Sequence, residues 1–329
     1  ACGGMLFPVL VYSFVCAPGA PGGQGLAIPM ATDIAFSLGV LSLLGKRVPL
    51  SLKIFLTAFA VVDDIGGILV IAVFYSSHVA YGYLLVAILL LILLYFVGKR
   101  AVTNKLFFLV IGVVIWYLFL QSGIHSTIAG VLLAFVIPAK PQLRVGRYIE
   151  RIRRIINTFP VMGENDIVLT NEQIAQLKRV ESASDRVISP LQSLEDNLHG
   201  VVNYIILPLF AFVNAGVVFS GGGEVIGEVS IAVALGLLCG KFLGIYFFTW
   251  LAVKSKLTPM PQGMDWKNIA GVALLGGIGF TVSLFIANLS FGVTHPVLLN
   301  QAKFGVLSGT ALAGILGYIV LYLVLPKKR

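Results

Sequence analysis

The chain has 329 residues, of which 58% are hydrophobic and only 11% are charged. Soluble domains are about 45–50% apolar, so this composition excludes an ordinary soluble domain and predicts an integral, all-α membrane protein. In a soluble protein a net charge of +9 would suggest a nucleic-acid partner, but here the basic residues gather in the connections between apolar segments.

Apolar stretches follow one another along most of the chain. A membrane-spanning helix needs about 20 such residues. We therefore predict about ten spans, near residues 3–17, 25–45, 49–75, 82–98, 104–120, 123–139, 198–218, 229–253, 268–291 and 301–325.

The chain begins at Ala1, without a Met, directly on an apolar segment, and the first predicted span is short. Neither a basic segment nor a small-residue cleavage pattern precedes it, so we do not predict a signal peptide. We expect N-terminal sequence, up to whole helices, to be missing.

Lys and Arg alternate between connections. They occupy every second connection and the C-terminus, at 46–47, 99–105, 140–154, 254–267 and 327–329. The other connections contain neither residue, at 18–24, 76–81, 121–122, 219–228 and 292–300. By the positive-inside rule, the basic connections and the C-terminus are cytoplasmic.

Residues 140–196 carry 17 of the 37 charged residues of the chain. We predict that they form a cytoplasmic insertion between a first membrane group of about six helices (1–139) and a second group of about four (197–329). The insertion begins with a short basic amphipathic helix, and a second helix is expected near 171–185. Its simplest role is a solvated linker that touches anionic lipid headgroups.

Two spans contain helix breakers in mid-segment. Pro29 precedes Ala31-Thr32-Asp33 in the second span, and Gly276-Gly277-Ile278-Gly279 interrupts the ninth. Lipid cannot satisfy the backbone groups that such breaks expose. Paired interruptions in two halves of a chain indicate a transporter site. Spans one to three and eight to ten are candidate repeats, although they share no strong residue identity.

Three acidic residues lie deep in apolar spans: Asp33, Asp63 and Asp64. Each costs about 2.5–3.5 kcal/mol to insert when ionised. Burial and repulsion between like charges both favour the neutral form of a carboxyl group, so Asp63–Asp64 can exchange a proton for a cation. Carboxylate oxygens suit a hard cation such as Na⁺ or Li⁺, and Thr32 and broken-helix carbonyls can complete its shell.

Lys241 lies near the middle of the eighth span. A lysine at this depth needs an acidic partner or loses its proton, and an acid of the Asp63–Asp64 pair is the obvious candidate. Asp33, which follows Pro29, can neutralise the positive ends of half-helices.

His125 and His199 open the sixth and seventh spans, and His199 follows Glu195-Asp196. Histidine titrates near physiological pH, so both are candidates for pH sensing, although a histidine at a span end is more often an interface residue. No spacing indicates a resident metal, a catalytic triad or a phosphate loop. We therefore expect no cofactor and no enzymatic activity.

Eight short stretches of the chain together form a specific pattern: IPMATDIAF (28–36), RVPLSLKIFL (47–56), VDDIG (62–66), GIHSTIAG (123–130), LPLFAF (207–212), NAG (214–216), GK (240–241) and GIGFTVS (277–283). In these stretches the chain resembles the NhaA-type sodium/proton antiporters of bacterial inner membranes. The resemblance covers almost the whole chain except 142–190.

This resemblance implies inverted repeats with two crossing broken helices, and electrogenic exchange that moves more protons than sodium ions. It implies that Asp64 is the principal sodium ligand and that Asp63 pairs with Lys241. Thr32 and Asp33 match the family residues that lie where the two broken helices cross. His125, Glu195 and His199 match positions linked to the pH response.

The resemblance implies twelve helices, so we expect the first two to be missing from this sequence, together with a periplasmic β-hairpin used for dimerisation. A homodimer is therefore expected only when the N-terminal region is present. The alternatives are a sodium-coupled symporter of an organic solute on a related fold, and a non-transporting scaffold, which would leave the buried acids and Lys241 unexplained.

Overall fold

The computed structural model describes residues 1–17, 19–74, 79–99, 105–141, 143–159, 170–217, 225–260, 263–292 and 294–326. Every regular element in these ranges is a helix, as predicted. The chain forms two compact units, the first made of Ala1–Ser76 and Asn203–Arg329 and the second of Ser77–Val202.

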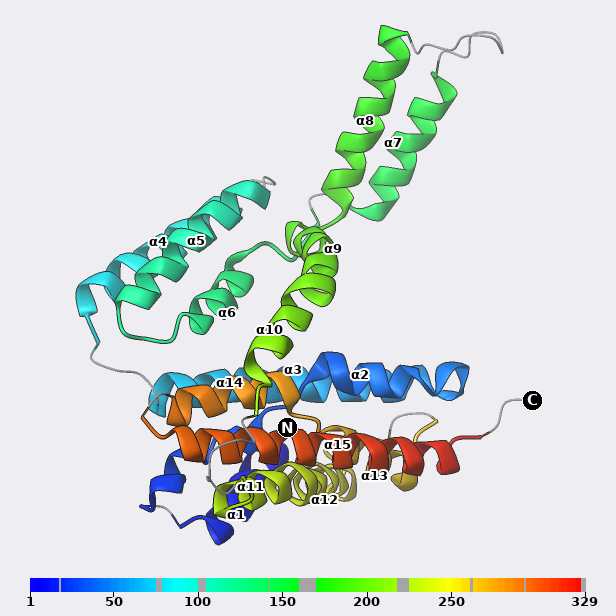
Figure 1. The fold of residues 1–329 in the computed structure, drawn as a ribbon. Coiled ribbons are helices and arrows are strands. Elements are labelled where there is room, and N and C mark those ends of the chain that lie inside the picture. Colours follow the sequence, from blue (N-terminus) through cyan, green and yellow to red (C-terminus); the bar gives the residue numbers. More distant parts are fainter. Residues whose placement is uncertain are drawn as a thin grey trace. The chain divides into compact units, whose positions relative to one another are not determined.

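The first unit is a bundle of mostly apolar helices (Figure 1). Its elements are α1 (Cys2–Val15), η1 (Pro21–Gly25), η2 (Ile28–Met30), α2 (Ile34–Ser42), η3 (Gly45–Arg47), α3 (Leu50–Phe74), α10 (Leu207–Asn214), α11 (Glu228–Leu235), η5 (Gly236–Gly240), α12 (Lys241–Lys254), α13 (Trp266–Leu275), α14 (Phe280–Phe291) and α15 (Pro296–Val324). The π-helical turn η4 (Val202–Ile206) precedes α10.

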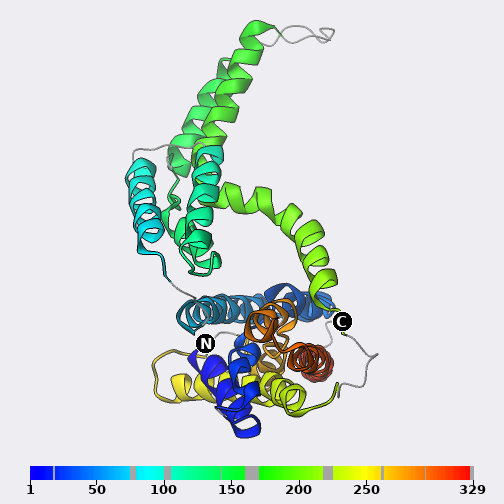
Figure 2. The same ribbon diagram turned by 60° about the vertical axis from the view of Figure 1, so that its left-hand side comes forward.

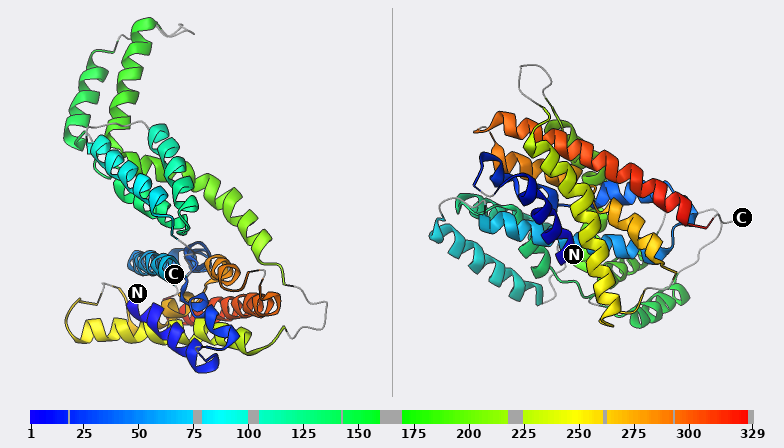
Figure 3. Two further views of the ribbon diagram at one scale, coloured as in Figure 1. Left: turned by 90° about the vertical axis from the view of Figure 1, so that its left-hand side faces the viewer. Right: turned by 90° about the horizontal axis from the view of Figure 1, so that it is seen from below.

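The long helix α15 lies against α11, α13 and α14, and α1 lies against α11 and α12 (Figure 3). Small residues permit these close approaches. An added Cβ at Gly244 of α12 would lie 2.0 Å from the carbonyl oxygen of Gly3 in α1. In a membrane, helices associate through such tight contacts between small residues, because lipid is as apolar as their side chains.

The second unit contains α4 (Tyr81–Lys99), α5 (Lys105–Gln121), α6 (Thr127–Val136), α7 (Val145–Asn157), α8 (Asn171–Val187) and α9 (Pro190–Val201). Its apolar core is formed by α4, α5 and α6. Helices α7 and α8 lie side by side as a hairpin (Figure 2), which confirms the two helices predicted in the charged insertion.

Each predicted span coincides with an apolar helix in the described residues. Within the described ranges, five helices are long and apolar enough to cross a membrane: Leu50–Ala72, Tyr81–Lys99, Pro190–Asn214, Glu228–Lys254 and Pro296–Val324. Two bent pairs bring the number to seven, and three shorter apolar helices match the remaining predicted spans. The multi-span, all-α architecture is confirmed, while the count of ten and the inverted repeat stay predictions.

Both predicted breaks are present. Pro21–Met30 and Ile34–Ser42 meet at 47°, and Trp266–Leu275 and Phe280–Phe291 meet at 44°. The broken helix is the middle member of each candidate trio of spans.

The division into two compact units differs from the predicted order of membrane group, insertion and membrane group. The unit of Ser77–Val202 combines the charged insertion with three of the predicted spans. The predicted grouping concerns the position of each segment relative to the membrane, so it stays a prediction.

The contact between α1 and α12 gives a stability prediction. Gly244→Ala should lower the free energy of unfolding by about 1–3 kcal/mol, the usual cost of overpacking, because the new Cβ meets backbone. The matched control is Gly39→Ala in α2, where an added Cβ meets nothing within 4 Å. Equal melting temperatures of both purified variants in detergent would contradict the prediction.

Candidate functional site

The two broken spans meet at their breaks. The backbone N–H of Asp33 donates to the carbonyl of Ile278 at 2.6 Å. Ser37 Oγ donates to the carbonyl of Leu275 at 3.0 Å, and Ser283 Oγ donates to the carbonyl of Ile28 at 2.8 Å. Each break thus satisfies backbone groups of the other, which lipid cannot do.

The Asp33 carboxylate joins the N-terminal ends of two half-helices. Its Oδ1 accepts from the Phe36 amide of α2 at 3.1 Å. Its Oδ2 accepts from the Thr281 amide of α14 at 3.0 Å and from Thr281 Oγ1 at 2.5 Å. Asp33 is buried, and its negative charge offsets the positive ends of both helix dipoles.

Lys241 is fully buried at the first position of α12. Its ammonium forms an ion pair with Asp63 Oδ2, and it donates to the carbonyl of Met30 and, at 2.9 Å, to Thr32 Oγ1. These three acceptors match the three N–H donors of an ammonium group. The Met30 carbonyl lies at the C-terminal end of the half-span Pro21–Met30, where carbonyl groups lack a partner within the helix and can accept from a cation.

Thr32 connects Lys241 to both breaks. Its Oγ1 lies 2.8 Å from Asp63 Oδ2 and 3.0 Å from the carbonyl of Gly276. A hydroxyl has one hydrogen, so Thr32 donates to only one of these acceptors at a time.

The adjacent carboxyl groups of α3 retain unused oxygens. Among the described residues, Asp63 Oδ1 and Asp64 Oδ1 are both buried without a hydrogen-bond partner. Asp64 also interacts electrostatically with Asp63, Lys241 and Asp33, and with the backbone amide of Thr32. Buried carboxylate oxygens without a donor are suitable ligands for a hard cation or sites for a proton.

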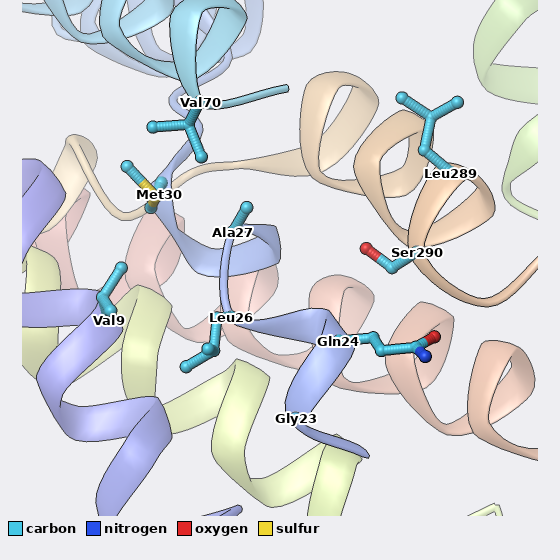
Figure 4. Close-up of a pocket in the computed structure, with 9 residues that line it drawn as sticks. All are labelled: Val9, Gly23, Gln24, Leu26, Ala27, Met30, Val70, Leu289 and Ser290. Atoms are coloured by element: carbon cyan, nitrogen blue, oxygen red, sulfur yellow. The ribbon is translucent and has the colours of Figure 1, made fainter. Parts of the chain in front are cut away.

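A cavity of about 570 Å³ lies beside the first break, within the same unit. Figure 4 shows the residues that line it: Val9, Gly23, Gln24, Leu26, Ala27, Met30, Val70, Leu289 and Ser290. Since Met30 accepts from Lys241, the cavity reaches the edge of the charged cluster.

The five predicted ion-site residues thus lie in one unit and around one crossing. The three residues linked to pH lie in the other unit. His125 is partly buried in the turn before α6, while Glu195 and His199 are exposed on one face of α9, four residues apart. Their role in a pH response stays a prediction.

Three residues that form the crossing, Met30, Thr281 and Ser283, are not predicted from the sequence as individual site residues. The carbonyl of Met30 cannot be recognised as a ligand from its side chain. Thr281 and Ser283 belong to the GIGFTVS stretch, but only the fold brings them to Asp33 and Ile28. The one signal in the sequence is a pair of hydroxyl residues within four residues after the last glycine of the break.

The Lys241–Asp63 ion pair gives the next prediction. Lys241→Met should lower the free energy of unfolding by about 3–5 kcal/mol, because it leaves a buried carboxylate without its cation. Lys241→Met/Asp63→Leu should be more stable than the single variant. The measurement is detergent-induced unfolding of the purified proteins, and a double variant less stable than Lys241→Met would contradict the interpretation.

The chain is similar to known sodium/proton antiporters. Residues 1–321 match the family model described as Na⁺/H⁺ antiporter 1. The chain is 84% identical to the Na⁺/H⁺ antiporter NhaA of Bacteroides fragilis and 80% identical to that of Bacteroides thetaiotaomicron, in each case over 100% of this chain and 75% of the relative. It is 47% identical to NhaA of Porphyromonas gingivalis over 98% of this chain and 72% of the relative. The chain therefore belongs to the Na⁺/H⁺ antiporter 1 family.

Proposed function

We propose that this sodium/proton antiporter exchanges its two ions at the Asp63–Asp64 pair. Asp64 is the principal ligand of Na⁺ or Li⁺, and Asp63 contributes Oδ1, the oxygen that Lys241 does not engage. Thr32 and Asp33 position the site, and no resident cofactor takes part.

The observation that carries this proposal is the pair of buried carboxylate oxygens without hydrogen-bond partners. A buried acceptor without a donor costs about 1–3 kcal/mol, and more when it is charged. Either a proton or a bound cation removes that cost, but both cannot occupy the same oxygen. Competition for one site is the physical basis of exchange.

The charges of the site support electrogenic transport. When Asp63, Asp64 and Lys241 are all ionised, the cluster carries one net negative charge, which one Na⁺ neutralises. Protonation of both aspartates instead leaves the charge of Lys241. A cycle that exchanges two protons for one Na⁺ therefore moves net charge across the membrane, as the family resemblance implies.

The crossing of the broken spans is suited to alternating access. Backbone and hydroxyl groups at each break form hydrogen bonds with the other broken span, so the two broken helices can move as one body without exposing these groups to lipid. The cavity that contains Met30 is a candidate route for ions from the side of the connection at 18–24.

The alternative functions have less support. A sodium-coupled symporter needs a polar cavity for its solute, and the comparisons give this alternative no support. A scaffold would not require two buried carboxylate oxygens without partners. Membership of an antiporter family indicates a transporter rather than an enzyme.

We also propose the bacterial inner membrane as the location of the protein, with the basic connections and the C-terminus in the cytoplasm. The alternation of Lys and Arg between connections supports this orientation. A homodimer is proposed for the protein when its N-terminal region is present.

The direct test is transport by the purified chain in proteoliposomes. Asp64→Asn keeps the size of the side chain but cannot be ionised, so sodium-dependent proton flux should fall to the rate of protein-free vesicles. Asp265→Asn is the matched control, because Asp265 is an exposed aspartate at the start of α13 in the same unit. Substantial exchange by Asp64→Asn would refute the proposed site.

A second test concerns net charge. If the cycle is electrogenic, an imposed inside-negative potential should change the rate of exchange in proteoliposomes at constant ion gradients. Collapsing the potential with a potassium ionophore at equal potassium concentrations is the control. A rate that does not depend on the potential would show one-for-one exchange.

A further inference from the structure

The basic helix α7 packs only one edge against α8. Ile155 is 7% exposed, and Tyr148 Oη and Ser184 Oγ lie 2.9 Å apart across the hairpin. The amide of Leu143 donates to the carbonyl of Arg186 at 2.9 Å, which fixes the base of the hairpin.

A second apolar edge of α7 is open. Val145, Ile149 and Ile156 are 60%, 52% and 65% exposed. At 3.6 residues per turn, their spacing places all three within one narrow stripe along the helix. Exposed isoleucines in a charged, amphipathic helix indicate a surface that binds an apolar partner.

The charge of this helix selects an anionic partner. Arginines border the apolar stripe and cover the opposite face, with Glu150 as the sole acidic residue from 144 to 157; they are Arg144, Arg147, Arg151, Arg153 and Arg154. In α8 acidic and basic residues are balanced. The excess positive charge of the hairpin is thus on the helix that carries the open apolar stripe.

Both ends of the hairpin adjoin apolar helices. Only eight residues separate the end of α6 at Val136 from the start of α7, a reach of at most about 30 Å. At the other end, Ile188 and Ser189 are extended and lead directly into Pro190, where the candidate span Pro190–Asn214 begins. The hairpin is therefore held near a membrane surface, on the side that the basic residues make cytoplasmic.

We propose that α7 is a membrane-surface helix that binds anionic lipid. Val145, Ile149 and Ile156 enter the boundary between headgroups and acyl chains, while the arginines bind lipid phosphates. A helix with a strong apolar stripe, a basic polar face and low overall hydrophobicity is typical of such binding. This inference does not depend on the proposed ion site.

The test uses the full chain carrying Cys2→Ala, Cys16→Ala and Cys239→Ala. One spin-labelled cysteine is then introduced at a time, by Ile149→Cys, Ile156→Cys or Glu150→Cys. Labels are read by their accessibility to oxygen, which concentrates in lipid, and to a water-soluble nickel chelate. Proteoliposomes are made with phosphatidylglycerol and phosphatidylcholine in equal parts, or with phosphatidylcholine alone.

In the anionic vesicles, labels at Ile149 and Ile156 should favour oxygen, and the label at Glu150 should favour the nickel chelate. Phosphatidylcholine alone should shift the first two labels towards water. Arg151→Gln/Arg153→Gln should cause the same shift in anionic vesicles. The matched control Lys178→Gln/Arg179→Gln removes equal charge from α8 and should cause none.

Labels at Ile149 and Ile156 that stay in water in anionic vesicles would overturn the proposal. So would labels that are shielded from both reagents and show spin coupling between copies, because a second copy would then cover the stripe. Equal oxygen accessibility in both kinds of vesicle would overturn the role of the arginines. Sodium-dependent proton flux in the same vesicles verifies that each variant is folded.

Discussion

Two buried charges, those of Asp33 and Lys241, lie where the two broken helices of the first unit cross, and the surrounding structure must stabilise both. A helix break in a membrane exposes backbone groups, and an ionised side chain there has no water. In this chain the exposed backbone groups and the ionised side chains stabilise one another. Asp33 lies at the positive ends of α2 and α14, and Lys241 lies at the carbonyl end of the half-span Pro21–Met30, so each charge is compensated by groups at a helix end.

Asp63 and Asp64 differ from this pattern, and the difference is what makes them suitable for exchange. Asp33 uses both carboxylate oxygens in hydrogen bonds, and Lys241 uses all three of its donors. The aspartate pair of α3 keeps one buried oxygen free on each residue. A site with completed hydrogen bonds is structural, whereas a site with incomplete bonds can accept an ion.

Much of this arrangement could be predicted from the sequence. Only 11% of the residues are charged, so the aspartates and the lysine in mid-span indicate which helices carry the site. Pro29 and the glycines at 276–279 predict the two helix breaks. The sequence cannot predict which backbone carbonyls face Lys241, because every residue has one. It also could not predict that Thr281 joins Asp33, since that contact depends on how two distant breaks cross.

If a proton and Na⁺ compete for the carboxyl of Asp64, sodium binding must remove a proton from that group. Infrared difference spectroscopy of the purified protein, recorded on adding Na⁺ near neutral pH, measures this change. A band from a protonated carboxyl group should disappear as Na⁺ binds, and this change should be absent in Asp64→Asn. Sodium binding that leaves every protonated carboxyl band unchanged would refute competition at Asp64.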